Sequence, residues 1–235
     1  MSRVPLRHRI YIAFISGLLW LYYRLYHRMD VEHIEYLPKQ GPLLVILNHV
    51  SVLEVLALGA MIARQGITPG VNLRAVAKQE LFGNAVLAWF ARGVGMFPID
   101  RERSDMSAMR IMVNTLDEGK VLVIAPEGTR SPTGRLQAFQ PVIAKIAITR
   151  RLKILPVGAI GAERALPVGA KFPHPVKMAL RFGPVFELSE FYDKPITAAE
   201  MDRASWVMRD HVARLLPEWM RELPPNSGRI GARKL

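Results

Sequence analysis

Two short and wholly apolar runs constrain the fold of this chain more than any other feature of its sequence. They are Leu43–Leu47 and Val121–Ala125, and neither shows the alternation of polar and apolar residues expected of a strand with one wet face. Strands buried on both faces are typical of parallel sheets with helices on either side. Because strand-like and helix-like stretches alternate along the rest of the chain, we predict a single α/β domain whose central sheet is mostly parallel and flanked by helices.

The expected elements follow from the hydrophobic periodicity of each stretch. Strands are predicted at 43–47, 71–77, 94–99, 121–125, 154–158 and 176–182. Helices are predicted at 52–64, 81–91, 104–118, 141–150 and 198–216, and residues 163–175 are expected to form a long loop. The 235 residues are enough for one such domain with a sizeable core.

The first apolar run leads into residues 48–54, with the sequence NHVSVLE. A carboxylate that accepts from one ring nitrogen of a histidine leaves the other nitrogen free to take a proton, so Glu54 can orient His49 as a general base. The same residues also fit a helix capping box, in which Glu54 bonds a backbone N–H and Ser51 caps the helix. Local sequence leaves both interpretations open.

The second apolar run leads into residues 126–131, with the sequence PEGTRS. Here Arg130 stands beside a glycine turn at Gly128, an arrangement that can hold an anion. An ordinary turn with a solvated arginine fits the same letters. Since ligands of open parallel sheets lie beyond the carboxyl ends of the strands, residues 48–54 and 126–131 are expected to face one cleft.

The order of these motifs, a strand followed by NHxxxxE and much later a strand followed by PEGTRS, resembles the lysophosphatidic acid acyltransferase family. Two further blocks occur in the order of that family. One combines residues 77–82 (AKQELF) with 95–101 (GMFPIDR), and the other is 154–158 (ILPVG). The resemblance extends over roughly residues 30 to 190 and indicates the glycerolipid acyltransferase superfamily.

The resemblance implies an enzyme that moves a fatty acyl chain from acyl-CoA or acyl carrier protein to the free hydroxyl of a lysophospholipid, most simply 1-acylglycerol-3-phosphate, to give phosphatidic acid. It implies His49 as the general base and Glu54 as its orienting partner, without a bound cofactor. Because the thioester is already activated, Ser51 is expected to cap a helix and not to act as a nucleophile. The acceptor phosphate and the rest of the acceptor are expected at Arg101, Glu127, Gly128, Thr129 and Arg130, with Asn48 and Lys78 as further candidates.

Two departures from the family pattern leave the acceptor and the activity open. The first block of the family usually ends in aspartate, whereas this chain has Glu54, whose side chain is longer by one methylene. Residues 139–142 (FQPV) stand where relatives commonly have Phe-Lys-x-Gly. An acyltransferase for another lyso-lipid or a glycolipid, and a catalytically impaired relative that binds lipid, are therefore the alternatives.

The composition narrows the classes of partner. There are no cysteines, which excludes disulfides, thiolate metal sites and a cysteine nucleophile. The formal net charge of +12 favours anionic partners, such as acyl thioesters, lysophospholipids, acyl carrier protein or an anionic membrane surface. Nucleic acid is not expected, because the basic residues are scattered and no zinc-finger, RNP-like or basic-helix pattern occurs. No group of His, Asp and Glu has the spacing of a metal site.

The N-terminal segment has the composition of a membrane-associated helix. Residues 10–23 carry no charge, arginines stand on both sides, and the segment is rich in the aromatic residues that lie at headgroup level. The uncharged run is short for a span and favours a helix in the interface, although a helix of a soluble core fits the same length. We expect a membrane-associated helix over 1–30, an acyltransferase domain over 31–222 and a flexible basic tail over 223–235. The family resemblance implies the cytoplasmic face of the cell membrane.

Overall fold

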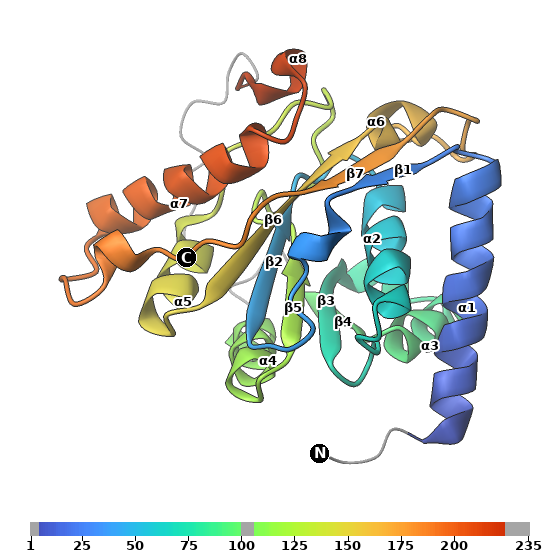
Figure 1. Cartoon of the computed structure of the whole chain (residues 1–235), viewed down its shortest axis with the longest axis horizontal. Helices are drawn as coiled ribbons and strands as arrows, with labels where there is room; N and C mark the ends of the chain where they lie inside the picture. Colours follow the sequence, from blue (N-terminus) through green and yellow to red (C-terminus); the bar gives the residue numbers. More distant parts are fainter. Residues whose placement is uncertain (1–4, 100–105, 224–235) are drawn as a thin grey trace.

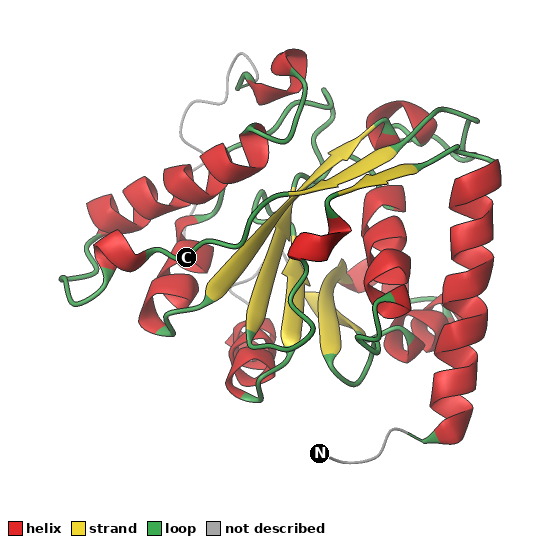
Figure 2. Ribbon diagram, viewed as in Figure 1, coloured by secondary structure: helices red, strands yellow, loops and turns green. Residues whose placement is uncertain are grey.

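The computed structural model describes residues 5–99 and 106–223, and its centre is a sheet between two layers of helices (Figure 1, Figure 2). The seven strands of this described part lie in the order β1-β7-β6-β2-β5-β3-β4. They are β1 (Asp30–Glu32), β2 (Leu43–Leu47), β3 (Leu73–Lys78), β4 (Met96–Ile99), β5 (Val121–Ile124), β6 (Lys153–Ile160) and β7 (Ala179–Phe182).

The sheet is mostly parallel, as predicted. Strands β6, β2, β5, β3 and β4 run parallel to one another, whereas β7 is antiparallel to β6 and β1 is parallel to β7. The central pair β2 and β5 is buried at every residue, as their wholly apolar sequences predict. The short edge strand β1 is not among the predicted strands, because three half-buried residues carry no periodic signal.

Helices cover both faces of the sheet. Figure 1 shows α1, α2 and α3 on one side and α4, α5 and α7 on the other. Right-handed crossovers require this division, since the connections through α2 and α3 run one way along the sheet and those through α4 and α5 run back. The helices are α1 (Leu6–Leu25), α2 (Leu53–Arg64), α3 (Ala85–Gly93), α4 (Met106–Asp117), α5 (Pro141–Thr149), α6 (Ala162–Ala165), α7 (Ala198–Ala213) and α8 (Glu218–Arg221), with 3₁₀ turns η1 (Ile34–Tyr36), η2 (Gln79–Phe82) and η3 (Ser189–Phe191).

Two departures from the predicted elements have local causes. Helix α3 begins later than predicted because η2 takes the residues before it and the Asn84 side chain caps α3, accepting from the N–H groups of Val86 and Leu87. The predicted loop over 163–175 lies partly in α6. Gly161, with φ of +85°, turns the chain there, where a Cβ would collide with the carbonyl of Lys177.

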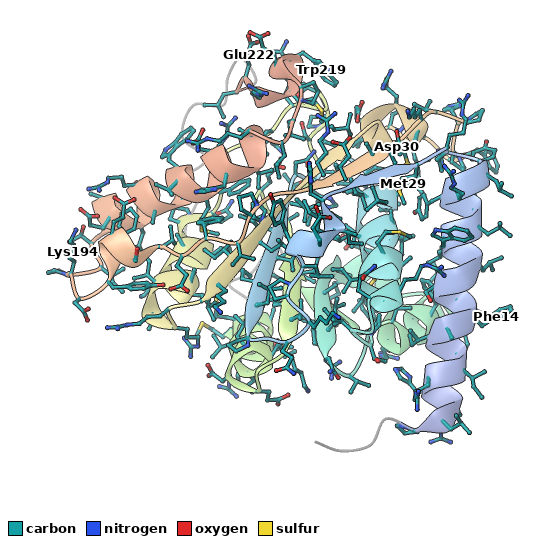
Figure 3. The ribbon with its side chains drawn as sticks, viewed as in Figure 1. Phe14, Met29, Asp30, Lys194, Trp219 and Glu222 are labelled. Atoms are coloured by element: carbon teal, nitrogen blue, oxygen red, sulfur yellow. The ribbon has the colours of Figure 1, made fainter. Side chains whose placement is uncertain are left out.

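Helix α1 packs along α2 and leaves a row of apolar residues uncovered. Tyr23 is fully buried, and its hydroxyl donates to the carbonyl of Leu53, the first residue of α2, at 2.8 Å. Figure 3 shows Phe14 pointing away from the body of the protein, and this side chain is 68% exposed. No helix in the described ranges is both long enough and apolar enough to cross a membrane. The exposed row repeats at helical spacing and consists of Leu6, Ile10, Phe14, Leu18, Leu21 and Leu25.

Candidate active site

The register of the two central strands brings the two sequence motifs together. Ile46 of β2 pairs with Ile124 of β5, and His49 and Glu127 each lie three residues further along. The His49 N–H donates to Glu127 Oε1 at 2.7 Å, and the Ser131 N–H donates to the His49 carbonyl at 2.7 Å. Residues 48–54 and 126–131 therefore form one site at the carboxyl edge of the sheet, where open parallel sheets bind ligands.

His49 and Glu54 form a buried hydrogen-bonded pair in this site. Nδ1 of His49 lies 2.7 Å from Glu54 Oε1, and the two residues are 8% and 0% exposed. A carboxylate at this position accepts the Nδ1–H proton, which leaves the lone pair on Nε2. Within the described residues Nε2 of His49 has no hydrogen-bond partner. Glu54 Oε2 is buried without a partner, whereas His49 Nε2 is not among the buried atoms that lack one. The pair is therefore arranged to take a proton at Nε2.

One oxygen of Glu54 binds both the histidine ring and a backbone N–H, but the N–H is not that of the N-cap residue, so no capping box forms. Glu54 Oε1 accepts from His49 Nδ1 and also from the backbone N–H of Val50, at 3.2 Å. The longer glutamate side chain reaches back over the turn from the first turn of α2. Its extra methylene therefore does not break the pair with histidine.

Ser51 is not the N-cap of α2, contrary to the prediction. Val52 occupies the cap position, and no side chain caps the helix there. The hydroxyl of Ser51 donates instead to the carbonyl of Leu166 at 2.9 Å and accepts only a long bond of 3.4 Å from the Leu53 N–H. Because its hydroxyl is committed to the segment after α6, Ser51 fastens the turn that carries His49.

Asn48 supports the same turn from the other side. Its side-chain amide donates to the carbonyl of Ala159 at 2.9 Å and accepts from the N–H of Ala159 at 2.7 Å. These two bonds continue the β2–β6 ladder beyond Leu47, the last residue of β2 paired with β6. Asn48 is fully buried, so its side chain fixes the backbone and does not face the solvent.

Glu127 is buried behind His49 and accepts only from N–H groups of the protein. Oε1 binds the His49 N–H, and Oε2 accepts from the backbone N–H of Gln137 at 3.2 Å and from its side-chain Nε2 at 3.0 Å. Burial raises the pKa of Glu127 to about 7, although these three hydrogen bonds act in the opposite direction. Glu127 thus fixes the backbone of the histidine and not its ring.

The turn that follows Glu127 carries the predicted anion ligands. Gly128 has φ of +75°, a conformation that favours glycine, and the Gln140 side chain lies beside it. Thr129 is exposed. Arg130 is half-buried, and no carboxylate in the described residues pairs with it. A guanidinium without a counter-ion can bind an anionic group.

Two predicted residues fall outside what the structure describes. Lys78 is the last residue of β3, but its side chain is not described, and Arg101 lies outside the described residues altogether. Within the described ranges no group of three or more His, Asp or Glu residues could hold a metal ion.

Two residues of the site were not predicted from the sequence. Gln137 holds Glu127, and Arg209 of α7 donates to the carbonyl of Gln137 at 3.1 Å. Arg209 is 72 positions from Gln137 in the sequence. Its sequence context does not distinguish it from an arginine on a helix surface. The sequence offers no signal that marks this contact.

Comparison with known proteins shows which family the chain belongs to. The family model described as Acyltransferase matches residues 28–160, which include β2, β5 and both motifs. The chain belongs to the acyltransferase family. The resemblance to lysophosphatidic acid acyltransferases is confirmed, since the similar proteins carry that name.

Several curated acyltransferases align with the chain. It is 25% identical over 158 residues to the chloroplastic 1-acyl-sn-glycerol-3-phosphate acyltransferase of Arabidopsis thaliana, covering 65% of this chain and 42% of the relative. It is 31% identical over 103 residues to the 1-acyl-sn-glycerol-3-phosphate acyltransferase of Bacillus subtilis, covering 44% and 49%. It is 32% identical over 136 residues to the human alpha form of this enzyme, covering 55% and 44%. The matched part spans less than half the length of each of these relatives.

A solved structure confirms the fold. The crystal structure of the 1-acyl-sn-glycerophosphate acyltransferase from Thermotoga maritima superposes with a TM-score of 0.71, covering 92% of this chain and 84% of the other at 23% identity. The α/β architecture predicted for this acyltransferase chain is thus found in a solved relative.

Proposed function

We propose that this chain transfers a fatty acyl group from acyl-CoA or acyl carrier protein to the hydroxyl of a lysophospholipid, with 1-acylglycerol-3-phosphate as the acceptor and phosphatidic acid as the product. The observation that carries the proposal is the His49–Glu54 pair, with Nδ1 bound to a buried carboxylate and Nε2 unpartnered in the described part of the chain. The names of the aligned relatives support the same reaction.

The chemistry needs one proton transfer in each direction. His49 Nε2 takes the proton of the acceptor hydroxyl as its oxygen attacks the thioester carbonyl, which forms the new C–O bond. The carboxylate of Glu54 stabilises the imidazolium that results. When the C–S bond breaks, the imidazolium returns the proton to the leaving sulfur, so the thiol leaves neutral and the histidine is restored.

Arg130 is the proposed ligand of the acceptor phosphate. Its guanidinium can bind two phosphate oxygens at once, and its neighbour Ser131 is bonded to the His49 carbonyl. This short connection keeps the proposed phosphate site and the base in one loop system. Arg101 and Lys78 stay candidates for the phosphate or for the acyl donor.

An apolar pocket of about 40 Å³ lies along α2 from the pair, and it would have to widen before a hydrocarbon chain could enter. It lies between α1, α2, α3 and the sheet, and its lining is almost entirely apolar. Val55 and Leu56, which line it, directly follow Glu54 in α2. An acyl chain whose thioester is at His49 therefore has apolar surface within one helical turn.

The uncovered face of α1 supports an interfacial location on a membrane. A row of exposed apolar side chains on a helix that packs on the enzyme body buries favourably in the headgroup boundary. The formal charge of +12 favours an anionic surface. We propose the cytoplasmic face of the membrane, as the resemblance to the family implies.

The test measures release of thiol from acyl-CoA, and in parallel from acyl carrier protein, with 1-acylglycerol-3-phosphate as acceptor. Wild-type protein should release thiol only when the acceptor is present, and His49→Ala should abolish release. Glu54→Gln removes the charge without changing the size, and kcat should fall by about 100-fold or more because the imidazolium loses its counter-ion. No release with either donor would overturn this choice of acceptor.

One observation favours a second acceptor class. Gln140 lies beside Gly128, so a neutral amide stands at the turn where relatives commonly carry a lysine. A weaker positive field at the acceptor suits a lyso-lipid with a smaller negative charge. A panel in which 1-acylglycerol-3-phosphate is inert and another lyso-lipid or a glycolipid reacts would select this alternative.

A further inference from the structure

A buried arginine of α7 holds the chain segment that supports Glu127. Arg209 is 8% exposed, and its guanidinium donates to the carbonyls of Leu136 at 2.9 Å, Gln137 at 3.1 Å and Arg221 at 2.6 Å. In the part of the chain that the structure describes, no carboxylate pairs with this guanidinium. The guanidinium also lies over the Trp206 ring, with Cζ 5.4 Å from the ring centroid, but a buried charge without a counter-ion costs free energy that a neutral side chain would not.

The charge of Glu127 lies close enough to act on this arginine. Burial lowers the pKa of the Arg209 guanidinium, and the Glu127 carboxylate partly offsets that effect. The two groups do not touch; Gln137 lies between them. Its carbonyl accepts from Arg209, while its backbone N–H and side-chain Nε2 both donate to Glu127 Oε2.

The sequence of bonds continues to the proposed base. Glu127 Oε1 accepts the backbone N–H of His49 at 2.7 Å, while Glu54 holds the ring. The bond to the backbone N–H fixes the position from which the His49 side chain extends. The bond to Glu54 fixes the orientation of the imidazole ring. Two separate carboxylates therefore fix the histidine.

We propose that Arg209 and Gln137 are positioning residues, which hold His49 in its reactive place through Glu127. This inference rests on the proposed acyl transfer, since the reactive place is defined by that reaction. It assigns a role in the active site to α7, which lies outside the four sequence blocks and outside residues 28–160. Displacement of a base by about 1 Å can lower a rate by about 100-fold, so the effect belongs in kcat and not in KM.

Replacing the side-chain amide of Gln137 by a carboxylate tests the bond between Gln137 and Glu127. Gln137→Glu keeps the size but sets a second carboxylate against Glu127. We expect kcat to fall by about 100-fold at a pH where both carboxylates ionise and repel each other, and the loss to shrink at lower pH, where one of them takes a proton and donates it to the other.

A matched pair of lysine variants tests the end of the chain of bonds. Arg209→Lys keeps the charge but cannot reach three carbonyls in a fork, and it should lower kcat by about tenfold at unchanged KM. Arg214→Lys is the control, since Arg214 lies on the same helix, is exposed and pairs with Asp210. Equal kcat in the two variants, with only the melting temperature of Arg209→Lys lowered, would overturn the proposal.

Hydrogen exchange of the His49 amide gives a readout that needs no turnover. This N–H donates to Glu127, so its exchange should be at least about tenfold faster in Arg209→Lys than in wild-type protein or in Arg214→Lys. Faster exchange in a protein that is inert towards all acceptors would reject the proposed function and keep the positioning of His49. Unchanged exchange would reject the positioning whether or not the protein is active.

Discussion

At the scale of single residues, the site depends on two glutamates that bind different parts of one histidine. Glu54 binds the ring at Nδ1, and Glu127 binds the backbone N–H. The first role could be predicted from the sequence, because five positions of spacing across a turn bring a carboxylate back to the ring. The second role could not be predicted, since it depends on which strands are neighbours. A glutamate at position 127 is equally compatible with binding of the substrate.

Glu127 makes the stability of the protein depend on pH. Its pKa is raised from 4.5 to about 7 by burial, so between these values the folded chain holds a proton that the unfolded chain has lost. The free energy of unfolding should therefore be highest below pH 4.5, as far as this group is concerned, and fall by about 3 kcal/mol as the pH rises through 7. Urea unfolding from pH 5 to 8 measures it. Glu127→Gln lacks this titration, and an equal slope in the variant would refute the assignment.

At the scale of elements, the link between β2 and β6 is completed by a side chain. Asn48→Ala leaves both the N–H and the carbonyl of Ala159 without their partner in the interior. Since each buried unpaired group costs about 1–3 kcal/mol, the free energy of unfolding should fall by about 3 kcal/mol. Urea denaturation checks the value. Asn114→Ala, on the exposed side of α4, is the control and should change it by less than about 0.5 kcal/mol.

The elements themselves were largely predictable, and the errors have physical causes. The buried strands β2 and β5 have unmixed apolar sequences, so their place in a covered parallel sheet follows from composition. The start of α3 was misplaced because periodicity does not distinguish a 3₁₀ turn from the first turn of a helix. The role of Ser51 was misassigned because its partner, Leu166, is 115 positions away.

At the scale of the whole molecule, we propose that the uncovered face of α1 docks the protein on a membrane. Phe14→Glu places a charge in the middle of the apolar row without entering the core, since this side chain is 68% exposed. Binding to vesicles that contain anionic phospholipid should weaken by about tenfold or more, because apolar burial is lost and a negative charge meets a negative surface. A flotation assay measures this. Ile111→Glu, on α4 across the sheet, should bind as wild type does, and equal binding by both variants would exclude α1 as the docking face.

Contacts between residues that are far apart in the sequence limit what the sequence can reveal about the site. Motifs at residues 48–54 and 126–131 are visible because each lies within one turn after a strand. The bonds from Arg209 to Gln137 connect segments that become neighbours only when α7 packs beside the sheet. Such contacts leave no local pattern, so a single sequence cannot predict them.

The common register of β2 and β5 also restricts how this part of the gene can change. His49 and Glu127 meet because each follows its paired isoleucine by the same number of residues. A codon inserted after β2 would carry the histidine past its carboxylate, and only a matching insertion after β5 would bring them together again. Insertions and deletions at this edge are therefore tolerated in pairs or not at all.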